Sequence, residues 1–505
     1  MQSNKKKIVQ GVASDSVIFV LTTLISFSVI PFYLHFISLE EFGIYVAIQG
    51  IVAVVSLADI GLPMHSTKKL SKDIFFESKE LNPYLHSAQI FQYILGLALL
   101  FLGYLVYSSV DSFLDVNLAY ANITQEVFLL YWFSVIVGVW FGLNHAILRS
   151  RHELKYINIS IFMILILSSG LNIIFLYLDY GLISFGISIL ITTIVVNAFI
   201  AIKVYKNYKI NLLIPKEFHT QYIAHGLHYI MQFQFIRIAQ VSKTSLFTVL
   251  LSNYGGQSLV AQYNITNKAP ALIPGFISKV IMNLFPSISA HFENGEREKI
   301  IPYFEKIFKL GVFTIIFFLY ALFSLNEIFI DLWVGQDNFI GIEIFIFILL
   351  NFVIMTFISF TGIIIQGSGE FKKMPLISVI EFCVFLISSY MLFKIFGIIG
   401  FFLGYILSSM LGLVYPLFLV NRILNVNLIK FIVEGIKRFL VLLISMFFVD
   451  ITANLTIDNN LIKFLVISLL YLVLYLLLIG GYSKINVLKF LVEFYKAALR
   501  RINKK

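Results

Sequence analysis

Four basic side chains lie inside one hairpin, residues 226–285, which is expected to form two membrane-spanning helices, at depths where most of this chain has only Leu, Ile, Phe and Val. A cation at the centre of a bilayer costs at least about 2.5–3.5 kcal/mol, and this hairpin contains no acidic residue to offset it. We therefore expect these side chains to face a water-filled cavity that receives an anion. The Arg guanidinium fork suits a phosphate group. The four cations are Arg237, Lys243, Lys268 and Lys279.

Amide side chains accompany the cations. In the first helix of the hairpin, polar residues recur every third position, a row that drifts around the helix and predicts one wide polar face. In the second helix, Asn264, Lys268 and Lys279 share a face, because the step of eleven positions from Lys268 to Lys279 makes almost three whole turns. Pro270 and Pro274 in that helix are expected to bend it and to free backbone carbonyls. The amides expected to hydrogen-bond a polar substrate are Gln234, Gln240, Asn264 and Asn267.

Two other roles for the cations stay open on the sequence. Long basic side chains can snorkel to the membrane interface or pair with acids on other helices. Lys279 fits snorkelling as well as it fits a cavity, whereas Arg237 is too central to reach either surface.

Three acids are candidates for such pairing or for coupling transport to a proton or sodium gradient. Asp15, between two serines, is alternatively a helix N-cap. Asp59, just before the Gly61-Leu62-Pro63 helix break, alternatively ends its helix. Glu381 lies in an apolar run, where structural pairing is equally compatible with the sequence.

Composition assigns the chain to the integral membrane proteins. Of its 505 residues, 59% are hydrophobic and only 13% charged, and the mean hydropathy is +0.91. Apolar runs of about 20 residues recur along the whole length, which predicts an all-α protein with about 14 transmembrane helices. The single Cys383 excludes an intrachain disulfide. The expected spans are 12–36, 42–64, 84–108, 124–148, 156–178, 182–202, 226–252, 258–285, 307–325, 341–365, 375–394, 397–420, 435–453 and 461–483.

Charge asymmetry predicts the orientation. Alternate loops together with both termini hold 31 of the 37 Lys and Arg residues, so both termini are expected in the cytoplasm. The basic residues lie in short loops between the apolar runs, so membrane orientation accounts for the net charge of +10. We therefore expect no nucleic-acid partner. The opposite loops are short and acidic, and Asp450 and Asp458 are assigned to them. The basic C-terminal tail, residues 484–505, has apolar residues at helical spacing, which favours an interfacial amphipathic helix over a solvated tail.

An internal repeat divides the chain. Glu153-Leu154-Lys155 reappears as Glu370-Phe371-Lys372, and Gly181 and Gly397 begin similar turns at nearly the same offset. These matching offsets predict two parallel six-helix units. The expected domains are an N-terminal bundle (1–202), a cytoplasmic linker (203–225), a C-terminal bundle (226–420), and two extra helices with the basic tail (421–505).

Motifs for enzymatic or ATP-driven chemistry are not found in the sequence. It has no P-loop, zinc motif or nucleophile elbow. We expect no cofactor and no catalytic residue, and we expect a transporter, not an enzyme.

Five short motifs resemble those of the Wzx-type O-antigen and capsule flippases, which belong to the MOP superfamily with the MATE drug exporters and the lipid II flippases. They follow in the same order along the first twelve spans. They are Phe36-Ile37-Ser38-Leu39-Glu40-Glu41-Phe42-Gly43-Ile44-Tyr45, Asp59-Ile60-Gly61-Leu62, Leu332-Trp333-Val334-Gly335, Gly369-Glu370-Phe371-Lys372 and Gly397-Ile398-Ile399-Gly400.

The resemblance implies MATE-like, V-shaped bundles and alternating access in a bacterial cytoplasmic (inner) membrane. It implies an undecaprenyl-diphosphate-linked oligosaccharide substrate that moves from the cytoplasmic to the outer leaflet for surface polysaccharide biosynthesis. A polysaccharide polymerase and a chain-length regulator are the expected partners, together with the lipid bilayer.

Two rivals remain. A cation-coupled multidrug exporter of the MATE type would need acids in its cavity, whereas this hairpin is basic. A membrane polysaccharide polymerase or ligase is expected to carry a long external loop, and the expected external loops here are all short.

Overall fold

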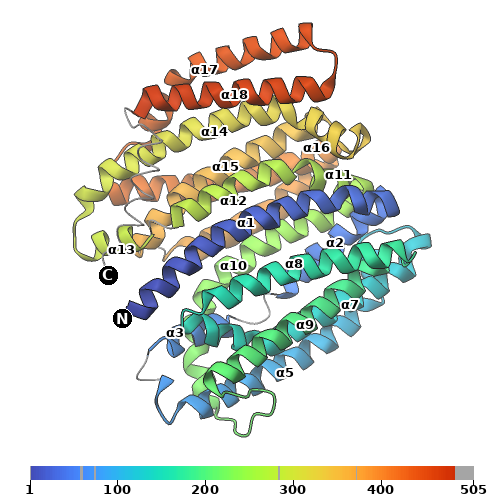
Figure 1. Ribbon diagram of the computed structural model, residues 1–505, viewed down its shortest axis with the longest axis vertical. Helices are drawn as coiled ribbons and strands as arrows, with labels where there is room; N and C mark the ends of the chain where they lie inside the picture. The colour runs from blue at the N-terminus through green and yellow to red at the C-terminus, as the bar shows by residue number, and fades with distance from the viewer. Residues whose placement is uncertain (1, 57–60, 73–75, 283–284, 371, 484–505) are drawn as a thin grey trace. The chain divides into compact units, whose positions relative to one another are not determined.

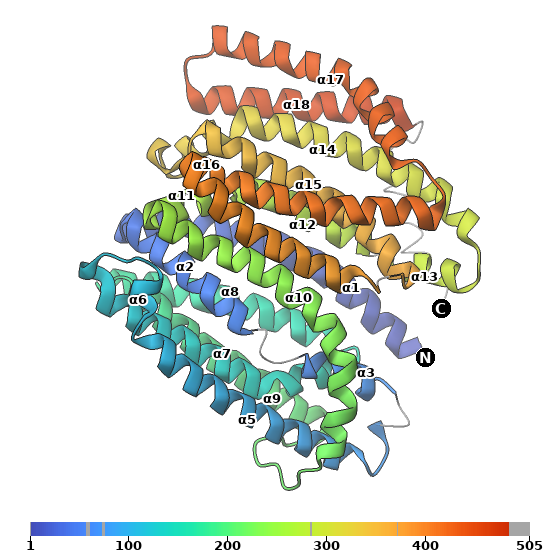
Figure 2. The ribbon, with the colours of Figure 1, turned by 180° about the vertical axis from the view of Figure 1, so that it is seen from behind.

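The chain folds into a set of long helices, which the computed structural model describes over residues 2–56, 61–72, 76–282, 285–370 and 372–483 (Figures 1 and 2). Eight helices of this described part are apolar and long enough to cross a membrane. The helices are α1 (Gln2–Phe36), α2 (Leu39–Val55), α3 (Leu62–Leu70), α5 (Leu81–Tyr107), α6 (Val110–Phe113), α7 (Ala121–Ser150), α8 (Leu154–Tyr177), α9 (Ile183–Tyr208), α10 (Thr220–Gly255), α11 (Gln257–Thr266), α12 (Lys268–Met282), α13 (Phe285–Glu293), α14 (Arg297–Val334), α15 (Ile342–Ser368), α16 (Met374–Leu424), α17 (Leu428–Thr456) and α18 (Asn460–Ser483).

Each of the fourteen expected spans coincides with helical structure. The eighth span is α11 together with α12, and the eleventh and twelfth are the two arms of α16, which bends at Gly397. A straight helix of 51 residues would be about 77 Å long, far more than one crossing of a bilayer core of about 30 Å. The bend therefore separates two crossings, and the all-α membrane fold is confirmed.

Two compact units are distinguished by their internal contacts. One consists of Met1–Asn264 with Lys372–Ser408, and the other of Ile265–Phe371 with Ser409–Lys505. The division into bundles 1–202 and 226–420 with a linker 203–225 and an extra segment 421–505 is based on matching sequence blocks, and it stays a prediction. The basic tail, residues 484–505, lies outside the described residues.

The internal repeat has a counterpart in the backbone. His152 and Gly369, which directly precede the two repeated triplets, both have a positive φ, at 57° and 73°. Gly181 and Gly397 have φ values of 56° and 60°, and Lys209 and Asn425 have φ values of 58° and 52°. The two members of each pair are separated by nearly the same number of residues in all three pairs, as the sequence repeat requires. Positive φ is uncommon outside glycine, so this agreement is strong support for two copies of a helical unit.

The break in the eighth span lies just before its prolines. The ring of Pro270 clashes with the carbonyl four residues earlier, and α11 ends at that residue, Thr266. The freed Thr266 carbonyl accepts a hydrogen bond from Asn326 Nδ2 at 3.2 Å, and Thr266 Oγ1 accepts one from the Ile340 N–H at 3.1 Å. The expectation that the prolines free a backbone carbonyl is confirmed, and α14 supplies the donor.

Three details of the sequence interpretation are wrong. Asp15 is not an N-cap, because α1 begins at Gln2 and continues through it. The second span does not extend to residue 64, because α2 ends at Val55 and α3 starts at Leu62 after Gly61, whose φ is 67°. Asp450 is not in a loop, because it lies within α17, which continues to Thr456.

Close packing of α2 against α10 and against the first residue of α11 depends on glycine. A Cβ on Gly43 would overlap the backbone carbonyl of Gln257, and one on Gly50 would lie 3.2 Å from the Ser245 carbonyl. The start of α2 is fixed by a capping box, in which Ser38 Oγ accepts from the Glu41 N–H and the Glu41 carboxylate accepts from the Ser38 N–H. The motif that surrounds Gly43 therefore encodes a helix start and a helix contact.

We predict that Gly43→Ala destabilises the protein whereas Gly138→Ala does not. Alanine favours a helix by up to about 1 kcal/mol over glycine, and a Cβ at Gly138 meets nothing within 4 Å. At Gly43 the overlap with backbone should cost about 1–3 kcal/mol. Thermal unfolding of the purified protein in detergent measures both variants. Equal melting temperatures would contradict the packing described for α2.

Candidate functional site

Lys243 forms a buried ion pair. Its Nζ lies 2.6 Å from Glu381 Oε1, and the two side chains are only 4% and 12% exposed. The pair joins α10 to the first arm of α16, and Lys243 Nζ also lies 4.6 Å from the centre of the Tyr405 ring on the second arm. The cation is therefore neutralised within one compact unit, both by a carboxylate and by an aromatic face.

An aromatic cluster packs one turn away from the ion pair. Phe247, four residues after Lys243, has ring contacts with Tyr263, Phe401, Phe402 and Tyr405 at centroid distances of 4.4–5.4 Å. Phe385, four residues after Glu381, contacts Phe401 and Tyr405. These rings exclude water from one side of the pair, which strengthens its attraction and raises the cost of removing either partner.

The sequence left open whether Lys243 faces a substrate or pairs with an acid on another helix, and whether Glu381 couples an ion or pairs with a cation. The contact between the two, 138 residues apart along the chain, supports the structural pairing in each case. Neither residue enters our functional proposal as a substrate or coupling site.

The polar row of α10 divides into two faces. Lys243 points into the protein, whereas Gln240 and Thr244, one turn apart, are exposed. Arg237 lies three residues before Gln240 and seven before Thr244, so its backbone position belongs to the exposed face. The side chains of Gln234 and Arg237 lie outside the described ones, although α10 includes both positions. An exposed polar face on a membrane helix indicates contact with water or with a polar ligand.

Lys268 lies at the first position of α12, directly after the helix break. It is half-buried, and it forms no ion pair with any residue that the structure describes. Asn267 lies in the break itself, its carbonyl accepting a hydrogen bond from the Ala271 N–H at 2.9 Å. Lys268 and Asn267 belong to one compact unit, and Asn264 belongs to the other.

The remaining sequence candidates are placed only in part. Lys279 is in α12 and Asp15 is in α1, and both side chains lie outside the described ones. Asp59 lies outside the described residues altogether.

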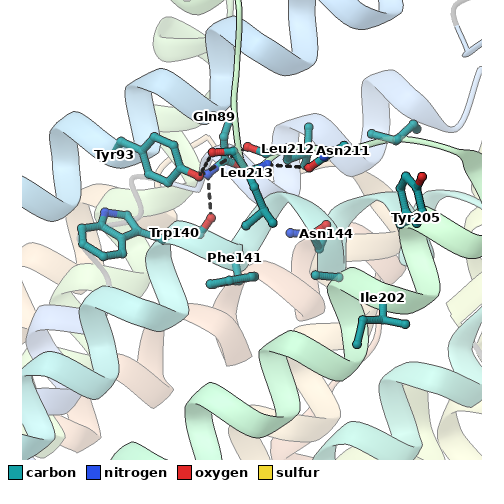
Figure 3. A pocket seen from close by; sticks show the side chains of 12 residues that line it. Gln89, Tyr93, Trp140, Phe141, Asn144, Ile202, Tyr205, Asn211, Leu212 and Leu213 are labelled. Carbon is teal, nitrogen blue, oxygen red and sulfur yellow. Dashed lines mark hydrogen bonds between the residues drawn. The ribbon is translucent and has the colours of Figure 1, made fainter.

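Sequence reasoning missed a cavity of about 250 Å³ in the first unit (Figure 3). It lies among α5, α7, α9 and the chain that follows α9. Gln89 Nε2 donates to the Trp140 carbonyl at 2.7 Å, while Tyr93 Oη donates to the carbonyls of Leu212 and Leu213 at 3.3 and 3.2 Å. The Gln89 bond joins α5 to α7, and the two Tyr93 bonds hold the first part of the expected linker against α5. Aromatic and amide residues are ordinary in membrane helices, so no pattern in the sequence pointed to this cavity.

We predict that Lys243→Met and Glu381→Gln each lower thermal stability strongly, whereas the double variant loses much less than the sum. Removing one partner leaves the other buried and uncompensated, at a cost of about 3–5 kcal/mol. A double-mutant cycle in detergent isolates the coupling. Lys394→Met is the matched control, because Lys394 is exposed in the same arm of α16. Additive losses would contradict the ion pair.

The comparisons with known proteins rest on structure. No family model matches the chain, and no curated protein matches it in sequence. A solved structure of the lipid II flippase MurJ, in an inward closed conformation, matches with a TM-score of 0.73 at 17% identity, covering 94% of this chain and 99% of that one.

Other solved structures of the same fold are drug transporters or relatives of them. An inward-facing multidrug resistance MATE family transporter of the MOP superfamily matches with a TM-score of 0.67 at 14% identity, covering 80% of this chain and 95% of that one. A MOP superfamily transporter from Pyrococcus furiosus, described as having a binding pocket of reverse polarity, matches with a TM-score of 0.55 at 15% identity. The match covers 83% of this chain and 97% of that one. The chain is thus a multi-pass membrane protein with the helical fold that MurJ and the MATE transporters share.

Proposed function

We propose that this protein is a flippase for lipid-linked oligosaccharides. It moves undecaprenyl-diphosphate-linked repeat units from the cytoplasmic to the outer leaflet of a bacterial inner membrane by alternating access, for O-antigen or capsule synthesis. Both termini lie in the cytoplasm, and the chain carries out no covalent chemistry. Polymerase and chain-length regulator proteins act on the same glycan after it is flipped.

The observation that carries the proposal is Lys268, a half-buried cation without an ion-pair partner among the described residues, in a chain with the fold of a lipid II flippase. An uncompensated ammonium at membrane depth is costly, and an anion offsets that cost. A diphosphate supplies this negative charge. In the proposal, Arg237 and Lys268 attract the diphosphate, and Lys279 assists them.

Amides serve the sugar part of the substrate. The exposed Gln240 on α10 and the half-buried Asn264 and Asn267 near the helix break offer both donors and acceptors. Sugar hydroxyls are matched by such groups. Gln234 is assigned the same role from its place in the polar row, and Asp15 and Asp59 stay the proposed residues for coupling to an ion gradient.

A multidrug exporter of the same fold is the alternative favoured by the MATE structures. A cationic drug would be repelled by Lys268, because like charges in a medium of low dielectric repel strongly. An anionic substrate therefore fits Lys268 better, whereas Lys243 is already neutralised by Glu381.

We predict that Arg237→Ala and Lys268→Ala each reduce surface polysaccharide about tenfold or more, since a lost hydrogen bond to a charged group costs about 1.5–3 kcal/mol. Immunoblots should show unchanged amounts of protein in the membrane. Lipid-linked repeats should accumulate in the cytoplasmic leaflet of the variant strains. Lys394→Ala, at an exposed lysine of α16, is the matched control and should leave polysaccharide unchanged.

Three outcomes would contradict the proposal. Full polysaccharide in both variants would remove the anion site. Drug sensitivity of a deletion strain with normal polysaccharide would favour the exporter. Complete but unpolymerised repeats in the outer leaflet of a deletion strain would favour a polymerase.

A further inference from the structure

Asp450 is a carboxylate within an apolar helix, and three hydroxyl groups donate hydrogen bonds to it. Tyr471 Oη donates to Oδ1 at 2.6 Å, Ser324 Oγ to Oδ1 at 2.9 Å, and Tyr320 Oη to Oδ2 at 2.8 Å. The Ser324 and Tyr471 hydroxyls are also 3.2 Å apart. The oxygen atoms of four side chains thus form one hydrogen-bonded cluster.

These side chains come from α14, α17 and α18, which pack side by side in one compact unit (Figure 1). Around them lies an apolar core that includes Phe317, Met446, Ala453 and Ile467. Tyr471 is only 1% exposed. At about 1.5 Å per residue, Asp450 lies about 9 Å from the end of α17, and Tyr471 about 16 Å from the start of α18. The cluster therefore lies away from the ends of these helices, with Tyr471 buried and Asp450, Tyr320 and Ser324 half-buried.

The charge of Asp450 is not balanced by a basic side chain. Within the part of the chain that the structure describes, no Lys, Arg or His nitrogen lies within 4 Å of its carboxylate. Two of the three hydrogen bonds go to Oδ1 and one to Oδ2, so acceptor capacity remains on Oδ2. An acidic side chain within a membrane helix is a functional-site hypothesis by default. Lys243 and Glu381 show the contrasting solution, in which the protein itself supplies the counter-charge.

We propose that Asp450, Tyr320, Ser324 and Tyr471 form a binding site for Na⁺. All the groups present oxygen, the ligand atom that hard cations prefer. Each hydroxyl keeps a lone pair after donating to the carboxylate, and the Met446 carbonyl, 3.4 Å from Tyr471 Oη, adds a further oxygen.

A single carboxylate matches a single positive charge. Divalent metals are usually held by several carboxylate, His or Cys ligands, and no such group of three is found among the described residues. The charge count thus favours a monovalent ion. The site shares no residue with the proposed substrate-binding cations of α10 and α12, so it can be tested independently of the proposed substrate.

Sodium-dependent thermal unfolding of the purified full chain in detergent tests the proposal. Sodium chloride is exchanged for choline chloride or potassium chloride at constant ionic strength. A ligand that binds only the folded state raises the melting temperature with its concentration, and we expect a rise of about 2–4 °C at saturating sodium. Choline should give no rise, and equilibrium binding of radioactive ²²Na⁺ should approach one ion per chain.

Variants locate the site. Asp450→Asn keeps the size and most hydrogen bonds but removes the charge, so the sodium response should vanish. Tyr320→Phe should raise the sodium concentration that gives half the effect about five- to tenfold, because one ligand is lost. Asp331→Asn is the matched control, since Asp331 of α14 pairs with Asn460 Nδ2 at 3.0 Å outside the cluster, and it should respond as the unaltered protein does.

Several results would overturn the proposal. Equal melting temperatures in sodium and choline, or a sodium response that persists in Asp450→Asn, would do so. Stabilisation by acid but not by sodium would assign the carboxyl to a proton instead. Should Asp450→Asn fail to fold, ²²Na⁺ binding to the unaltered protein and to Tyr320→Phe and Ser324→Ala still decides the question. No polysaccharide is measured here, so failure of this site is distinguishable from failure of the flippase proposal.

Discussion

A charge inside a membrane must be neutralised or solvated, and the described helices meet this requirement in different ways. Lys243 is paired with Glu381 and covered by aromatic rings. Asp450 receives three hydroxyl hydrogen bonds. Lys268 sits at a helix break without a carboxylate partner among the described residues. Because hydrocarbon offers no compensation, each arrangement indicates what the surroundings provide at that position.

Hydropathy and charge made most of the fold predictable. Apolar runs of about 20 residues located all fourteen spans because a bilayer imposes a length on each helix. The break near Pro270 was predictable as well, since the ring removes a donor and clashes with an earlier carbonyl. The ends of the helices were less predictable. Helix α2 ends at Val55, well before the end that the apolar pattern suggested, and α1 begins before Asp15.

The candidate site could be predicted only in part. The sequence identified Lys243 and Glu381 as unusual, but not that they meet, because a contact across 138 residues depends on how α10 and α16 pack. Asp450 was assigned to a loop although the expected span 435–453 includes it, because a charged residue near the end of an apolar run is usually placed in water; α17 continues past it to Thr456. Its hydroxyl partners look unremarkable in sequence, as Tyr and Ser are common in membrane helices and only the packing of α14, α17 and α18 brings them together.

The break between α11 and α12 has an energetic consequence for motion. In an intact helix, a change of direction ruptures backbone hydrogen bonds that lipid cannot replace. At Thr266 the carbonyl is held by the Asn326 side chain instead, and a bond of that kind contributes about 0.5–1.5 kcal/mol net. A change of direction at this break would therefore cost a side-chain hydrogen bond and would leave the backbone hydrogen bonds of both helices intact. Bending at residue 267 thus has a lower energetic cost than bending inside an unbroken helix.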